Sequence, residues 1–222
     1  MLHLEPSADR AKLGFAEAVV ANFGFLSEIG FVRVETKMTF VKYCSAQVFI
    51  NIYHGRASYE MNVEIGRVTE PTRTLSISDV LKWSGTYEDA GFGRHVMFQV
   101  STRDGVFEFV PRLASLVRSA AMPLLENKAS AWKEALELQQ RRWEEYVAEV
   151  NDSAAREKAE LAWQSKDMAE TARLYRSMKG NLTDVELRRL DYAEDHTVST
   201  NAGQTDSQKQ SVGHRYPETP RS

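Results

Sequence analysis

Cysteine is almost absent from this chain of 222 residues, since Cys44 is the only one. An intrachain disulfide is therefore excluded, as is usual for proteins of a reducing compartment. The N-terminal stretch carries Glu5, Asp9, Arg10 and Lys12 where a signal peptide needs an apolar segment. No apolar run approaches the length of a membrane-spanning helix. We therefore expect a cytoplasmic protein with no membrane partner.

A strong excess of one charge is also lacking. The chain has 28 Lys and Arg against 31 Asp and Glu, which gives a formal net charge of -3. Such a balance provides no general attraction for nucleic acid, so we expect no nucleic-acid partner. Hydrophobic residues are present in quantity, at 42%, which is enough for a substantial core.

The stretch from Val48 to Gly66 alternates apolar and polar residues as a β-hairpin does. A two-residue turn at Gly55-Arg56 pairs apolar with apolar residues. The predicted pairs are Ile52 with Tyr59, Ile50 with Met61, and Val48 with Val63. A turn at Ser45-Ala46 adds an upstream strand, in which Val41 lies opposite Ile50. The sequence therefore predicts a three-stranded antiparallel meander with one apolar face.

Helical periodicity predicts the remaining elements. The segment Asp9 to Ile29 has an apolar stripe that suits the sheet's apolar face, and a short helix is expected after a cap at Ser78. Further helices are predicted from Asp104 onward, over Lys128–Val150, Ser153–Ser165 and Met168–Met178, and after a capping box formed by Thr183 and Glu186. Pro111 predicts a kink or a late start in the first of these.

The predicted fold class is α+β. An N-terminal helix packs on the antiparallel meander, and a helical C-terminal half and a disordered tail follow. We place an α+β domain at residues 1–126, a helical extension with a hairpin at 127–196, and the tail at 197–222, where Ser, Thr, Gln, Asn and Gly dominate.

The second face of the predicted sheet mixes aromatic and polar side chains, which is unusual for a face open only to water. Two interpretations stand: a docking surface for another protein, or coverage by the Lys128–Val150 helix through Trp132 and Trp143. The residues predicted to bind a partner are Phe40, Lys42, Phe49, Asn51, Tyr53, Glu60, Asn62 and Glu64.

Groups that could carry chemistry are few. His54 is expected at the hairpin turn, near Glu60 and Glu64. These two glutamates are four residues apart on a strand, which separates their Cα atoms by about 13 Å. That distance is too large for them to share a metal ion. No histidine pair has the spacing of a helical metal site, so neither a metal nor a cofactor is expected. The alternative to docking is a ligand pocket near the Gly85–Gly93 loop that uses His54, Arg94 and His95.

Two resemblances add expectations. The run from Ala159 to Ala193 resembles one tetratricopeptide-like helical hairpin, although the usual proline near the repeat boundary is missing. The matching residues are Ala159, Ala162, Trp163, Asp167, Ala172, Leu174 and Tyr175. The front half, with "VKYCSAQVFINIYHGRASYEMNVEIGRV", is similar to a widespread group of uncharacterised bacterial proteins. That resemblance implies a small α+β domain and a bacterial source, and carries no activity.

These observations favour a non-enzymatic protein–protein interaction module of the adaptor or immunity type. The immunity type is suggested by analogy, because some proteins of this size and build are toxin-immunity partners. The alternative is a small-molecule-binding or hydrolytic domain. The sequence identifies neither the partner nor the oligomeric state.

Overall fold

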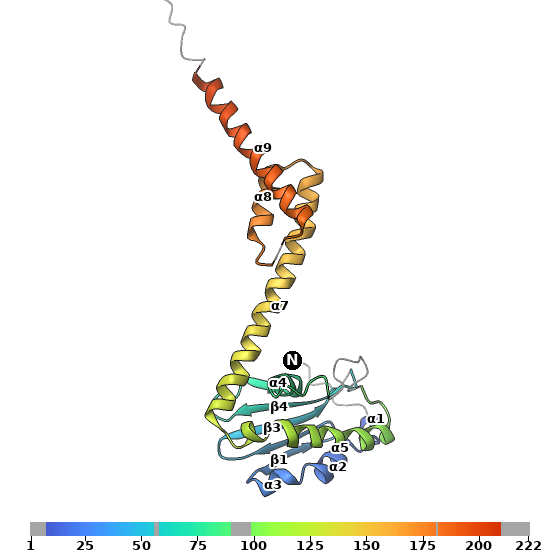
Figure 1. Cartoon of the computed structure of the whole chain (residues 1–222). Helices are drawn as coiled ribbons and strands as arrows, with labels where there is room; N and C mark the ends of the chain where they lie inside the picture. The colour runs from blue at the N-terminus through green and yellow to red at the C-terminus, as the bar shows by residue number, and fades with distance from the viewer. Residues whose placement is uncertain (1–7, 56–57, 90–98, 181, 210–222) are drawn as a thin grey trace, which may run out of the picture. The chain divides into compact units, whose positions relative to one another are not determined.

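The computed structural model describes residues 8–55, 58–89, 99–180 and 182–209 (Figure 1). The chain divides into two compact units, Met1–Arg141 and Arg142–Ser222. The first contains an antiparallel sheet with helices, and the second is helical. The predicted α+β fold class is thus confirmed.

The first unit is built on a five-stranded antiparallel sheet in which neighbouring strands follow chain order. Its strands are β1 (Val32–Lys37), β2 (Phe40–Cys44), β3 (Val48–His54), β4 (Met61–Arg67) and β5 (Thr74–Ser76). The predicted meander corresponds to β2, β3 and β4. β1 and β5 extend it on either side.

The register of the two predicted hairpins was wrong. Ile52 pairs with Val63 rather than with Tyr59, because the connection between β3 and β4 begins after the pair His54–Met61. Val41 pairs with Ile52 rather than with Ile50. Both corrections shift the pairing by an even number of residues, so each side chain keeps the predicted face.

The helix expected over Asp9–Ile29 is three short ones: α1 (Ala8–Ala11), α2 (Phe15–Asn22) and α3 (Phe25–Glu28). The first break is at Gly14, whose backbone is left-handed with a φ of 67°. A left-handed residue cannot continue an α-helix, and glycine adopts this conformation without strain. The apolar stripe still packs as expected, since Phe15, Val19, Phe23 and Leu26 are buried.

Helix α4 (Ile77–Trp83) begins two residues earlier than a cap at Ser78 would allow. The cap is Ser76, whose hydroxyl accepts a hydrogen bond from the Asp79 N–H at 3.2 Å. The Asp79 carboxylate accepts one from the Ser76 N–H at 3.0 Å, which completes a capping box.

Helix α5 (Arg103–Ala120) lies over one face of the sheet in Figure 1, with α2 beside it. It contains Pro111 in its interior, so the predicted late start of this helix was wrong. The short α6 (Met122–Leu125) and the start of α7 (Ala129–Gln164) complete this core. Trp132 is fully buried there, and its indole N–H donates to the Leu124 carbonyl at 3.0 Å.

The second unit contains the C-terminal part of α7, α8 (Met168–Ser177) and α9 (Asp184–Lys209). The two helices predicted over Lys128–Val150 and Ser153–Ser165 are one continuous helix, because no Gly or Pro interrupts α7. The capping box of Thr183 and Glu186 is confirmed. Helix α9 continues to Lys209, past Thr197 where the disordered tail was expected, and residues 210–222 lie outside the described residues.

Candidate functional site

The residues of the mixed face form rows across the sheet. Lys42 lies opposite Asn51, and Asn51 opposite Glu64. In the next row Phe40 lies opposite Tyr53, and Tyr53 opposite Asn62. Glu60 lies just before β4 and is exposed. The residues predicted from alternation as one face are therefore neighbours on it.

The two faces of the sheet differ sharply in burial. The opposite face supplies the buried core residues Val41, Ile50, Ile52, Val63 and Ile65. The side chains of the mixed face are mostly part-exposed, and this group contains Phe40, Lys42, Asn51, Tyr53, Asn62 and Glu64. The mixed face is therefore open to solvent along most of its length.

Trp132 of α7 does not cover this face. It packs in the core beneath the opposite face, with the Arg67 guanidinium 5.0 Å from its ring centroid. Trp143 belongs to the second unit. Within the first unit, the open surface is therefore the interpretation of the mixed face that fits.

Glu64 is the polar centre of the mixed face. Its carboxylate accepts hydrogen bonds from the Tyr53 hydroxyl at 3.4 Å and the Asn51 amide at 3.5 Å. Burial and the negative charge of Glu64 raise the pKa of Tyr53 to about 12. Tyr53 is therefore a neutral hydrogen-bond donor at physiological pH, held in a fixed position.

Phe49 differs from its neighbours because it is buried, with 5% of its surface exposed. Its ring lies over Gly66, where an added Cβ would be 2.4 Å from the ring. The Lys42 ammonium lies 4.8 Å from the centroid of the same ring. Phe49 is thus part of the floor of this surface, whereas Phe40 and Tyr53 remain accessible.

His54 is not at a solvated turn but in a buried cluster, with 2% of its surface exposed. Its ring is stacked on Phe15, with centroids 5.5 Å apart. Nε2 donates to the carbonyl oxygens of Val100, at 2.8 Å, and Tyr59, at 3.1 Å. Nδ1 accepts from the Arg10 guanidinium at 3.2 Å.

These contacts require a neutral imidazole with its proton on Nε2, because carbonyl oxygens only accept. Burial, with a further contribution from the Arg10 charge, lowers the pKa of His54. Both ring nitrogens are occupied, so His54 holds β3, the following loop and the Val100 segment together. Arg94 and His95, the other residues of the predicted ligand pocket, lie outside the described residues.

The described residues provide neither a metal site nor a membrane-spanning helix. No three His, Cys, Asp or Glu side chains among them are grouped closely enough to hold a metal ion. None of the helices in these ranges combines the length and apolar character needed to cross a bilayer.

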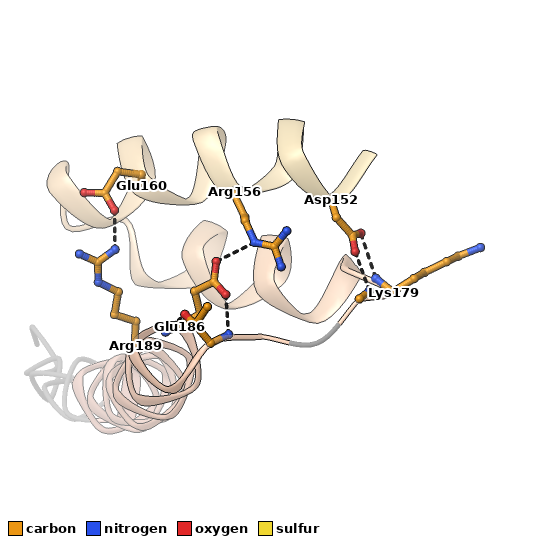
Figure 2. Close-up of polar contacts among 8 residues, drawn as sticks. Asp152, Arg156, Glu160, Lys179, Glu186 and Arg189 are labelled. Atoms are coloured by element: carbon orange, nitrogen blue, oxygen red, sulfur yellow. Dashed lines mark hydrogen bonds and ion pairs between the residues drawn. The ribbon is translucent and has the colours of Figure 1, made fainter. Parts of the chain in front are cut away.

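The second unit has a line of polar contacts along α7, shown in Figure 2. Asp152 accepts hydrogen bonds from the backbone N–H groups of Lys179 and Gly180. Arg156, one turn further on, pairs with Glu186 at 2.8 Å. Such a four-residue spacing places these side chains on one face of the helix.

The line of contacts continues from Glu160, which pairs with Arg189 of α9. The predicted hairpin residues Ala159, Ala162, Leu174 and Tyr175 are buried and form a small second core. The hairpin is therefore held by apolar contacts and by these three sets of polar contacts, and the repeat-like pattern of the sequence did not predict the polar ones.

A groove of about 780 Å³ lies in the same unit, and sequence reasoning missed it. Aromatic and cationic side chains meet there from α7, from the connection between α7 and α8, and from α9; they are Trp163, Lys166, Arg188, Arg189 and Tyr192. Arg189 already pairs with Glu160 and lies over the ring of Trp163. The Trp163 and Tyr192 rings are in edge contact, with centroids 5.5 Å apart.

Comparison with known proteins returns no relative: no family model, no curated protein and no solved structure matches the chain. The two resemblances described from the sequence therefore stay predictions.

Proposed function

We propose that this protein is a non-enzymatic interaction module, of the adaptor or immunity type, that binds another protein through the mixed face of its sheet. The observation that carries the proposal is the openness of that face. Helices and buried apolar residues occupy the opposite face, whereas the mixed face leaves aromatic side chains part-exposed. Aromatic groups in a polar surround are typical of protein interfaces.

The arrangement of charge defines the chemistry of the partner. Phe40 and Tyr53 provide an apolar area beside Lys42. The carboxylates of Glu60 and Glu64 lie toward the β4 side. We infer a folded protein that presents an apolar side chain to the aromatic area and Lys or Arg to the two glutamates, since complementary charge sets orientation and suppresses wrong partners.

The rival function, a ligand-binding or hydrolytic domain, was predicted to use His54, Arg94 and His95, of which His54 alone lies in the described residues. A general base needs a free nitrogen within reach of substrate. Nδ1 of His54 accepts from Arg10, Nε2 donates to two carbonyl oxygens, and the ring is buried. This geometry argues against His54 as a general base.

Site-specific photo-crosslinking in the native cell tests the proposal. A photoreactive amino acid is placed at Lys42, at Tyr53 and, as a control, at Lys133, whose side chain is 75% exposed on α7. We expect one protein to be crosslinked from the two face positions and not from the control. Different or no proteins from the two face positions, or the same protein from the control, would overturn the proposal.

Binding of the purified partner then provides a quantitative check. Glu60→Lys reverses the charge of an exposed side chain and sets it against the Lys or Arg of the partner, so we expect it to weaken binding at least tenfold, about 1.4 kcal/mol. Glu108→Lys makes the same change at an exposed position of α5 and should leave the affinity unchanged. Phe49 is a poor test position, because its ring covers Gly66 and its removal would disturb the sheet.

A further inference from the structure

The segment Arg142–Asn151 of α7 has a feature that the mixed sheet face does not explain. Each of its residues is at least partly exposed. The segment nevertheless carries large apolar side chains: Trp143 is 61% exposed, Tyr146 58% and Val150 48%. Trp143 and Tyr146 are in ring contact, with centroids 5.9 Å apart. Exposed apolar residues gathered in this way usually mark an interaction surface.

The spacing of these residues is that of a helix–helix contact. Trp143, Tyr146 and Val150 are three and four residues apart, which places them in one stripe, as positions a, d and a of a heptad. The stripe lies on a helix of 36 residues, about 54 Å long. The buried residues of the second unit's core begin only at Ala159. This stripe is therefore suited to receive another helix.

The charges beside the stripe indicate which helix. Arg142 and Glu149 both occupy the g position, so they lie on the same flank, two turns apart and opposite in sign. The side chain of neither makes an ion pair or hydrogen bond with another described residue. When two copies of such a helix run antiparallel, g positions face g positions. Arg142 of each copy then meets Glu149 of the other, and two equal ion pairs form.

A parallel pair does not have this complementarity. In parallel coiled coils a g residue faces the e residue five positions further along the other chain. Arg142 would then face Val147, and Glu149 would face Ala154. We propose that α7 pairs with α7 of a second copy of this chain in antiparallel orientation, through Trp143, Tyr146 and Val150.

Sedimentation velocity of the full chain over a series of concentrations tests this dimer. We expect a concentration-dependent monomer–dimer equilibrium. Arg142→Glu places like charges together at both ends of the contact, and should weaken dimerisation at least tenfold. The double variant Arg142→Glu/Glu149→Arg exchanges the two charges and should restore it.

The matched control is Arg141→Glu, which makes the same substitution one residue away, on the opposite side of the helix from the stripe. It should dimerise as the wild type does, and circular dichroism should show equal helix content in all variants. A monomer at every concentration up to about 1 mM would overturn the proposal. A dimer whose affinity is unchanged by Arg142→Glu would also overturn it, and so would a dimer that the double variant fails to restore. Either result would show that Arg142 and Glu149 do not pair across an antiparallel contact.

Discussion

The guanidinium of Arg10 donates to Nδ1 of His54 at 3.2 Å, and both side chains are buried. A second nitrogen of Arg10 donates to the Gly55 carbonyl at 2.9 Å, and the guanidinium lies 3.6 Å from the centroid of the Tyr59 ring. These contacts connect α1 to the end of β3 and to the loop that follows. They also fix the protonation state of His54, since a protonated Nδ1 could not accept from Arg10.

The stability of the first unit should therefore depend on pH through His54. The pKa of His54 is lowered in the folded protein, while in the unfolded chain it is about 6.5. Between those two pKa values the unfolded state binds more protons than the folded state, so folding is disfavoured as pH falls. We expect the free energy of unfolding, measured by urea denaturation, to decrease progressively as pH falls below about 6.5.

Two variants isolate this effect. His54→Gln cannot titrate in this range, so its stability should vary less with pH than that of the wild type. It should also be less stable at neutral pH by about 1–3 kcal/mol, because the variant lacks the ring that stacks on Phe15 and the Nδ1 that accepts from Arg10. The control His196→Gln removes an exposed histidine and should keep the wild-type pH dependence. An unchanged slope in His54→Gln would contradict the assigned neutral state.

Tyr53 should ionise much later than an exposed tyrosine. Its pKa is raised to about 12 by burial and by Glu64, against an ordinary value of about 10. The difference in absorbance between wild type and Tyr53→Phe reports this residue alone. It should show only about one tenth of the phenolate at about pH 11, where an exposed tyrosine is mostly ionised. Glu64→Gln should lower the pKa only in part, because burial remains; Tyr53 titrating with the other tyrosines would contradict the geometry.

Alternation along the strands was enough to predict which residues share the mixed face. That prediction stayed correct although the register of both hairpins was wrong. A β-strand has a period of two, so the corrected pairs Ile52–Val63 and Val41–Ile52 preserve the face. The turn lengths were not predictable in the same way. Gly55-Arg56 suits a tight turn by composition, but the His54–Met61 pair and the Tyr59 φ of 53° define a longer loop.

The role of His54 could not be read from the sequence, because its partners are distant along the chain. Arg10 and Val100 lie 44 and 46 residues away. The local sequence pattern predicts that His54 lies near a turn, but it does not predict whether the side chain is buried. The same limit applies to the groove of the second unit, which gathers Trp163 and Tyr192 only after α8 and α9 fold against α7.

Replacing Gly66 should show how closely Phe49 packs on the sheet. A Cβ at this position would lie 2.4 Å from the Phe49 ring, so Gly66→Ala must displace that ring. We expect a loss of about 1–3 kcal/mol in the free energy of unfolding, measured by urea denaturation. The loss should be smaller in a Phe49→Leu background, because the clash involves the ring.

Gly24→Ala is the matched control for this change. An added Cβ there meets nothing within 4 Å, and the backbone is helical, with a φ of -58°. The same substitution should therefore be neutral or stabilising by up to about 1 kcal/mol. Equal costs at Gly66 and Gly24 would show that the Phe49–Gly66 contact is loose.

Asp152 provides the corresponding test in the second unit. Its carboxylate accepts the N–H groups of Lys179, at 3.0 Å, and Gly180, and these bonds lower the pKa of Asp152. Asp152→Asn keeps the size but removes the charge and one acceptor oxygen. We expect faster hydrogen exchange at the Gly180 amide and faster proteolysis between α8 and α9, with the first unit unchanged.

The control for Asp152 is Asp191→Asn, at an exposed position of α9, which should leave both rates as they are. The contribution of the Asp152 carboxylate is present above its unfolded pKa of about 3.9, and it is lost as pH falls through the lower folded value. Wild-type exchange at Gly180 should therefore approach that of Asp152→Asn only in strong acid, after correction for the intrinsic rate. If exchange at Gly180 is equal in the two proteins at neutral pH, the carboxylate does not hold this loop.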